Sequence, residues 1–190
     1  MTIGGTMELD RLDELKKRVR DVPDFPKKGI IFKDITTLLK DAQSFRASVN
    51  TLVGAIQGTL PGGVKATPID QVVGIESRGF IFGPVLAYLL GVGFIPVRKK
   101  GKLPARTARV SYELEYGTDV LEIHEDALES GQRVLVVDDL LATGGTAQAV
   151  AKLIGQLGAK VACFTFLVEL EFLKGRDKLG SYPVFSVLKY

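Results

Sequence analysis

The chain has 190 residues, 46% of them hydrophobic, and a formal net charge of +3. This length suits one domain with an appendage better than two full domains, and the hydrophobic content allows a sizeable core. A single cysteine, Cys163, excludes a disulfide framework within the chain, and a single histidine leaves little material for zinc ligation or histidine-based catalysis. The N-terminus carries no secretory segment and no apolar run approaches about 18 residues, so we expect a cytoplasmic protein. The mild positive charge fits anionic substrates, and neither nucleic acid nor membrane is expected as a partner.

Residues 1–36 are expected to form an N-terminal helix and a small hood segment. Apolar residues recur at helical spacing from Leu9 to Val19, which predicts an amphipathic helix of roughly three turns. Two prolines and a glycine in Val22–Gly29 then indicate turns. Ile30–Thr36 is predicted as a short strand.

Residues 37–190 are expected to form the core domain, an α/β fold with a central, mostly parallel sheet flanked by helices. Asp41 is predicted to cap the first helix. Further helices are predicted after Gly79 and from Ala147 onward. Strands are predicted at Gln71–Ile75, Phe94–Val97, Val161–Val168 and Pro183–Leu188. The strand–helix–strand order predicts parallel pairing with right-handed crossovers.

A basic segment, Arg98–Arg109, follows the strand at Phe94–Val97. It contains glycine and proline and lacks apolar periodicity, so it is predicted to be a mobile loop. It leaves the carboxyl edge of a parallel strand, where open α/β sheets bind ligands. Such a loop is expected to close over a polyanion and exclude water, and a solvated charged surface is the alternative. Beyond it, His124 lies in an extended stretch and is expected at the surface.

The most informative stretch is Val134–Thr146, which reads V-L-V-V-D-D-L-L-A-T-G-G-T. Its apolar residues predict a buried strand, which Asp138 and Asp139 are expected to end. The glycines let backbone N–H groups surround an anion at a helix N-terminus, and Thr143 and Thr146 add hydroxyl donors. We therefore expect a phosphate there, with the carboxylates accepting hydrogen bonds from a sugar diol of the same ligand. An ordinary strand–loop–helix with surface aspartates is the alternative.

Several further stretches match one family in the same order along the chain. They are P-D-F-P-K-K-G-I-I-F-K-D-I-T, E-S-R-G-F-I-F-G-P, R-K-K-G-K-L-P, Y-E-L-E-Y-G and F-L-V-E-L. With the D-D-L-L-A-T-G-G-T motif, they resemble the adenine phosphoribosyltransferases, which are type I phosphoribosyltransferases, from about Leu12 onward. The resemblance implies the type I fold with a flexible loop over the site. It also implies a purine-salvage enzyme, commonly a homodimer, that joins adenine to phosphoribosyl pyrophosphate with Mg²⁺, giving AMP and pyrophosphate.

The resemblance also implies a role for each matching residue. Ribose 5-phosphate would be held by Asp138, Asp139, Ala142, Thr143, Gly144, Gly145 and Thr146. Pyrophosphate would be held by Ser77, Arg78, Lys99 and Lys102. Adenine would be held by Ile31, Phe32 and Lys33. Glu115 would be the catalytic carboxylate, serving a proton at N7 or N9 of adenine. Mg²⁺ would be held mainly by the substrate, with no protein ligand assigned. The family's matching turn can hold a cis peptide at Glu76–Ser77, which the sequence leaves open.

The extended backbone of Ile31–Lys33 suggests why adenine would be selected. The C=O of Ile31 and the N–H of Lys33 point to the same side and match the N6 donor and N1 acceptor of adenine. Hypoxanthine presents the reverse pattern, at a cost of about 1–3 kcal/mol per unpaired group. Two alternatives stay open: a hypoxanthine/guanine phosphoribosyltransferase, and a non-catalytic regulator of the same fold, which would require a DNA-binding module or a broad basic face.

Overall fold

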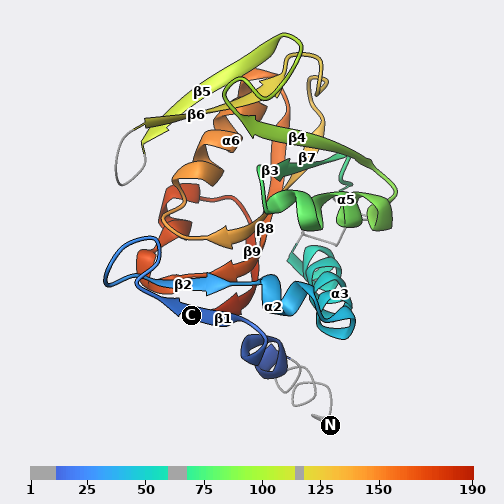
Figure 1. The fold of residues 1–190 in the computed structure, drawn as a ribbon. Coiled ribbons are helices and arrows are strands. Elements are labelled where there is room, and N and C mark those ends of the chain that lie inside the picture. The colour runs from blue at the N-terminus through green and yellow to red at the C-terminus, as the bar shows by residue number, and fades with distance from the viewer. Residues whose placement is uncertain (1–11, 60–67, 114–117) are drawn as a thin grey trace. The chain divides into compact units, whose positions relative to one another are not determined.

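The computed structural model describes residues 12–59, 68–113 and 118–190 (Figure 1). The chain divides into two compact units, Met1–Thr51 and Leu52–Tyr190, and the helix α3 (Ala42–Thr59) runs through the boundary. Within the described ranges, none of the helices combines the length and the apolar character that a membrane crossing requires.

The first unit contains a short helix, a hairpin and the start of α3. Residues 12–17 are helical. Strands β1 (Arg20–Pro23) and β2 (Ile31–Asp34) pair antiparallel, and α2 (Thr36–Leu39) follows. Asp41 begins α3, because its Oδ2 accepts a hydrogen bond from the backbone N–H of Ser44 at 2.9 Å. The predicted short strand and the predicted cap are therefore confirmed.

The second unit is built on a seven-stranded sheet in the order β5-β6-β4-β3-β7-β8-β9. Its strands are β3 (Gln71–Ile75), β4 (Gly93–Lys99), β5 (Thr107–Glu113), β6 (Thr118–His124), β7 (Arg133–Leu141), β8 (Lys160–Glu169) and β9 (Val184–Lys189). Strands β4, β3, β7, β8 and β9 are parallel, whereas the β5–β6 hairpin joins the edge of β4 antiparallel. The predicted α/β fold with a mostly parallel sheet is confirmed.

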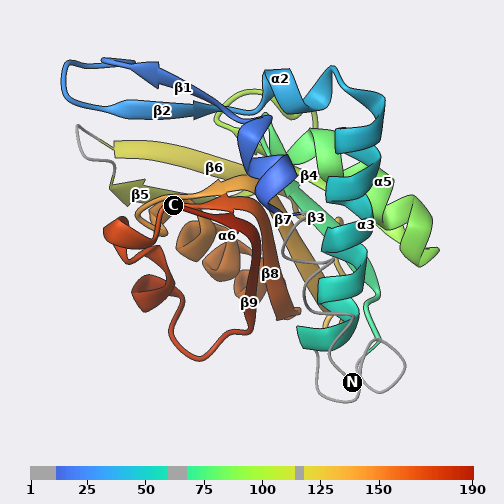
Figure 2. The same ribbon diagram turned by 90° about the horizontal axis from the view of Figure 1, so that it is seen from below.

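Two helices cover opposite faces of this sheet (Figures 1 and 2). On one face, Val73 and Val136 pack in a core cluster with Val150 and other residues of α6 (Gly145–Gln156). The other face carries α5 (Gly79–Leu90), and the Phe94 ring lies there between β3 and that helix. Parallel strands covered on both faces read as unbroken apolar runs, which is why their positions were predictable.

Two sequence-based boundaries were wrong. The acidic pair does not end its strand, because β7 continues to Leu141, which pairs with Glu169 of β8. The basic segment Arg98–Arg109 is also not one loop. Its first two residues pair with β6 as the end of β4, and Thr107 begins β5. Only residues 100–106 connect the two strands, because the hairpin supplies hydrogen-bond partners that the local sequence does not reveal.

Candidate functional site

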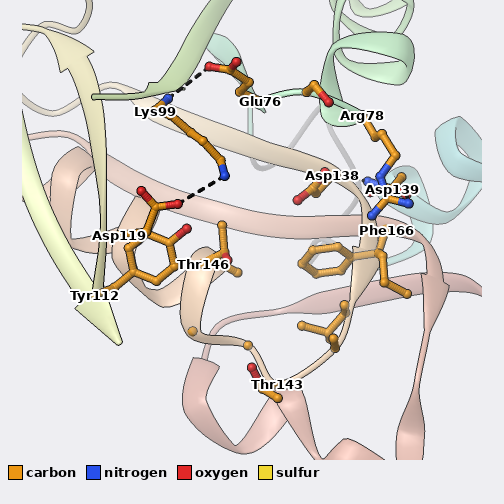
Figure 3. Close-up of a pocket in the computed structure, with 17 residues that line it drawn as sticks. Glu76, Arg78, Lys99, Tyr112, Asp119, Asp138, Asp139, Thr143, Thr146 and Phe166 are labelled. Atoms are coloured by element: carbon orange, nitrogen blue, oxygen red, sulfur yellow. Dashed lines mark hydrogen bonds and ion pairs between the residues drawn. The ribbon is translucent and has the colours of Figure 1, made fainter. Parts of the chain in front are cut away.

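A cavity of about 310 Å³ lies at the carboxyl ends of β3 and β7 (Figure 3). From β3 the chain crosses to β4 on one side, and β7 lies on the other side. Open α/β sheets bind ligands at such a switch point. The lining residues are Glu76, Ser77, Arg78, Lys99, Tyr112, Asp119, Asp138–Ala147 and Phe166.

One side of the cavity is the loop Ala142–Thr146, which leads from β7 into the first two residues of α6. All five of its residues, which the motif predicts to bind ribose 5-phosphate, line the cavity. Gly144 is the N-cap of α6 and has a φ of 79°, a left-handed conformation that favours glycine. The loop thus presents backbone at a helix N-terminus, which is a favourable environment for a phosphate.

The acidic pair lies at the start of this loop. The backbone N–H of Asp139 donates to Asp138 Oδ1 at 2.8 Å, and Arg78 Nη1 lies 3.0 Å from Asp139 Oδ2. Burial, and then the charge of Asp139, raise the pKa of Asp138 well above its usual value. Burial also raises the pKa of Asp139, although Arg78 opposes that shift. The structure therefore brings together the three charged residues that the motifs predicted.

The turn Glu76–Gly79 forms the opposite side and begins α5. Its Glu76–Ser77 peptide is cis, which answers the question left open by the sequence. A Cβ on Gly79 would lie 2.6 Å from the carbonyl oxygen of Val137, so only glycine allows this close approach of the turn to β7. The approach places Arg78 beside the acidic pair (Figure 3), and Ser77 also lines the cavity.

Lys99 completes this side from the end of β4. Its backbone N–H donates to Glu76 Oε2 at 3.0 Å, and its Nζ lies 3.2 Å from Asp119 Oδ2 (Figure 3). The hydrogen bond and the charge of Asp119 raise the pKa of Lys99. Lys102 is not among the residues that line the cavity, and its backbone C=O accepts a hydrogen bond from Arg98 Nη1 at 3.0 Å.

Glu76, Tyr112 and Asp119 line the cavity but were not predicted from the sequence. Tyr112 lies opposite Asp119 in the β5–β6 register. Burial raises the pKa of Tyr112, whose side chain is hydrogen-bonded to Thr146 and Asp119. The Y-E-L-E-Y-G-T-D stretch would have revealed this pairing only if it had been read as a hairpin.

Two groups of predicted residues are not placed in this cavity. Glu115 lies outside the described residues. Ile31, Phe32 and Lys33 belong to β2 in the first unit. There Lys33 Nζ is 2.6 Å from Asp21 Oδ1, and the Phe32 ring packs edge-on against Phe25. The proposed adenine site and the catalytic role of Glu115 therefore stay predictions.

The fold and the cavity are those of a phosphoribosyltransferase, and residues 38–184 match the model of the phosphoribosyl transferase domain. The chain is 58% identical over 178 residues to the adenine phosphoribosyltransferase of Acidobacterium capsulatum, with 94% of each chain covered. The structure of the adenine phosphoribosyltransferase from Thermoanaerobacter pseudethanolicus superimposes with a TM-score of 0.87 at 55% identity, covering 94% of this chain and 99% of that one.

The enzyme from Saccharomyces cerevisiae, solved with adenine and an imino-altritol bisphosphate, superimposes with a TM-score of 0.88 at 42% identity, covering 95% of this chain and 99% of that one. The chain belongs to the adenine phosphoribosyltransferase family.

Proposed function

We propose that this protein transfers the 5-phosphoribosyl group of phosphoribosyl pyrophosphate to N9 of adenine, giving AMP and pyrophosphate in purine salvage. The observation that carries the proposal is one cavity with the loop Ala142–Thr146 at the N-terminus of α6 on one side and the cations Arg78 and Lys99 on the other. The relatives named above are all adenine phosphoribosyltransferases, so a hypoxanthine/guanine enzyme is not favoured.

The β7–α6 side suits ribose 5-phosphate. The backbone of Ala142–Thr146 and the hydroxyls of its threonines would donate to the 5′-phosphate at the N-terminus of α6. Asp138 and Asp139 would accept hydrogen bonds from the ribose 2′ and 3′ hydroxyls. Their negative charge would also stabilise the positive charge that develops at C1′ as pyrophosphate leaves.

The β3–β4 side suits pyrophosphate. Arg78 and Lys99 each have a carboxylate partner in the structure, Asp139 and Asp119 respectively. A polyanion entering the cavity would offer both cations a partner of higher charge. Arg78 can bind two phosphate oxygens at once through its planar guanidinium, whereas Lys99 acts as a point charge. Lys102 would join them from residues 100–106.

The donors in the cavity fit Mg²⁺ that arrives with the substrate. Mg²⁺ is usually held by one or two carboxylates together with substrate phosphates, and Asp138 and Asp139 provide hard oxygen ligands in the cavity. When bound, the ion would neutralise charge on the departing pyrophosphate. The main ligands of the ion would be substrate oxygens.

Adenine would be read by the backbone of Ile31 and Lys33, with Phe32 stacking on the purine. Glu115 would exchange a proton with the imidazole side of adenine as N9 attacks C1′. A general acid or base contributes about 10²–10⁴-fold to rate. Glu115→Ala is therefore expected to lower kcat by at least about 10²-fold. Glu113→Ala, which removes a nearby exposed glutamate, is the matched control, and a loss of no more than threefold in Glu115→Ala would remove Glu115 from the catalytic role.

We further propose that the protein acts as a homodimer in the cytoplasm. The support for a dimer is the outer face of α5, where Tyr88 is 85% exposed and Leu89 is 51% exposed. Exposed apolar side chains gathered on one helix often mark a protein interface. Sedimentation equilibrium is expected to give twice the chain mass, and Tyr88→Lys is expected to shift the protein towards the monomer.

The purine specificity tests the proposed activity. The purified chain is incubated with Mg²⁺, phosphoribosyl pyrophosphate and adenine, hypoxanthine, guanine or xanthine in turn, and the nucleotides are separated by chromatography. Two opposed polar groups at about 1–3 kcal/mol each predict a preference for adenine of at least about 30-fold. IMP or GMP formed in preference to AMP would overturn the base assignment. Formation of no nucleotide would point to a non-catalytic regulator.

A further inference from the structure

The segment between β8 and β9 lies against the loop Ala142–Thr146, called the phosphate loop below. It contains two short 3₁₀ helices, η1 (Glu171–Leu173) and η2 (Gly175–Leu179). A Cβ built on Gly144 would lie under 3.0 Å from the carbonyl oxygen of Gly175, and one built on Gly175 would lie equally close to the carbonyl oxygen of Ala142. The two backbones are therefore in direct contact, with no space for a side chain on either glycine.

A partly buried ion pair fixes the start of η2. Arg176 Nε and Nη2 donate to the two carboxylate oxygens of Glu169 at 2.6 and 2.7 Å, and Nη1 donates to the carbonyl oxygen of Val184 at 2.8 Å. Burial alone would raise the pKa of Glu169, but hydrogen bonds from Arg176 and Ser186 outweigh it and the pKa is lowered. Glu169 is 3% exposed and ends β8, so the ion pair ties Gly175 to the sheet.

The other end of η2 is attached to α6. Gln148 Nε2, in the first turns of α6, donates to the carbonyl oxygen of Lys178 at 3.1 Å. Leu179 is buried in the same core cluster as the inner face of α6. The segment thus joins α6 to the end of β8, where Glu169 pairs with Leu141 of β7. The loop Ala142–Thr146 starts directly after Leu141 and leads into α6.

These contacts distinguish a supporting role from direct binding. Arg176 uses both terminal nitrogens and Nε in hydrogen bonds to the protein, and it does not line the cavity. The two parallel hydrogen bonds between Arg176 and Glu169 also fix the orientation of the Arg176 side chain more strongly than a lysine–carboxylate pair would fix a lysine. Arg176 can therefore act on a phosphate only through the backbone that it holds in place.

We propose that Gly175, Arg176 and Glu169 are positioning residues for the 5′-phosphate, because they hold the loop Ala142–Thr146 in its binding conformation. This inference rests on the proposed role of that loop and extends the phosphate site to a segment that does not line the cavity. It also gives a function to Glu169 of the F-L-V-E-L stretch. Displacement of Gly175 should weaken ligands that carry a 5′-phosphate and leave those without one unchanged.

The test compares AMP with adenosine, which differ only in the 5′-phosphate. Inhibition constants of both are measured against phosphoribosyl pyrophosphate for the wild type, Gly175→Ala and Arg176→Lys. The control is Gly155→Ala, because a Cβ there meets nothing within 4 Å. We expect the preference for AMP over adenosine to fall at least about tenfold in Gly175→Ala and about threefold or more in Arg176→Lys, as small displacements of binding groups typically cause. It should be unchanged in Gly155→Ala.

The outcomes separate this inference from the proposed function. A wild type that binds AMP no better than adenosine would contradict the phosphate loop itself, and the inference would fall with it. A wild type that prefers AMP, with folded variants that keep the same ratio, would overturn only the inference. If Gly175→Ala does not fold, Arg176→Lys and Glu169→Gln, which change the ion pair without adding a side chain at Gly175, decide the question.

Discussion

The two sides of the cavity differ in the groups that they present to a ligand. On the β7–α6 side, the loop Ala142–Thr146 lines the cavity, and its Gly144 lies directly against the backbone of Gly175. On the β3–β4 side, Arg78 and Lys99 are long side chains held by carboxylates at 3.0 and 3.2 Å. A ligand would therefore meet a prebuilt surface on one side and would exchange ion pairs on the other. The two sides should respond differently to mutation, salt and pH.

The largest effect is expected on the backbone side. Gly144→Ala places a Cβ on the Gly175 carbonyl and also requires an alanine at positive φ. A displacement of about 1 Å in a binding loop can cost about 10²-fold, so kcat/KM for phosphoribosyl pyrophosphate should fall by about that factor. Steady-state kinetics measures the change.

The matched control is Gly131→Ala, because Gly131 has a φ of 87° but nothing within 4 Å of a Cβ. It imposes the same backbone strain without the overlap. Equal losses in the two variants would show that strain alone explains the effect, and the close contact would then have no special role.

Removal of a cation from the other side should have the next largest effect. Arg78→Gln removes the cation that pairs with Asp139, whose side chain is only 4% exposed. Loss of charged hydrogen bonds costs about 1.5–3 kcal/mol, so KM for phosphoribosyl pyrophosphate should rise by about 10–100-fold. The KM for adenine should change much less. Arg46→Gln, on the exposed surface of α3, is the control, and an unchanged KM in Arg78→Gln would exclude Arg78 from the pyrophosphate site.

The acidic pair predicts a shift in the pH profile. Asp138 must be ionised to stabilise the positive charge that develops at C1′, and its pKa is raised first by burial and then by the charge of Asp139. The acid limb of kcat/KM should therefore lie above the ordinary aspartate range near pH 3.9. Asp139→Asn removes the neighbouring negative charge. This removal should lower the pKa of Asp138 and move the acid limb of kcat/KM to lower pH. A limb that stays in place or moves to higher pH would contradict this assignment.

The parts of the site that lie within one continuous stretch could be predicted from the sequence. The buried strand, the acidic pair and the Thr-Gly-Gly-Thr loop are adjacent in the chain, so local patterns are sufficient to place them. The same holds for the turn at Ser77–Arg78, which directly follows β3.

The parts that depend on pairing between distant strands could not be predicted. Asp119 reaches the cavity because β6 pairs with both β5 and β4, and a one-residue change in register would turn its side chain to the other face. The contact between Gly144 and Gly175 likewise depends on how the segment after β8 folds back. Neither arrangement leaves a local signal.

The smallest effect is expected at Asp119. Asp119→Asn removes a carboxylate from a cavity that would receive a polyanion and frees Lys99 from its ion pair. Exposed ion pairs contribute about 0–1 kcal/mol, so KM for phosphoribosyl pyrophosphate should fall by up to about fivefold at low salt. The gain should shrink at about 1 M salt, where charges are strongly screened. Asp126→Asn, at an exposed acid after β6, is the control, and a raised KM in Asp119→Asn would show that Asp119 assists binding.

A crystal structure with phosphoribosyl pyrophosphate and Mg²⁺ tests the contrast between the two sides most directly. The backbone of Ala142–Thr146 should superimpose within about 1 Å on the present structure, as prebuilt binding surfaces do. Lys99 Nζ should leave Asp119 Oδ2, now 3.2 Å away, for a pyrophosphate oxygen. A rearranged loop together with an intact Lys99–Asp119 pair would contradict the account.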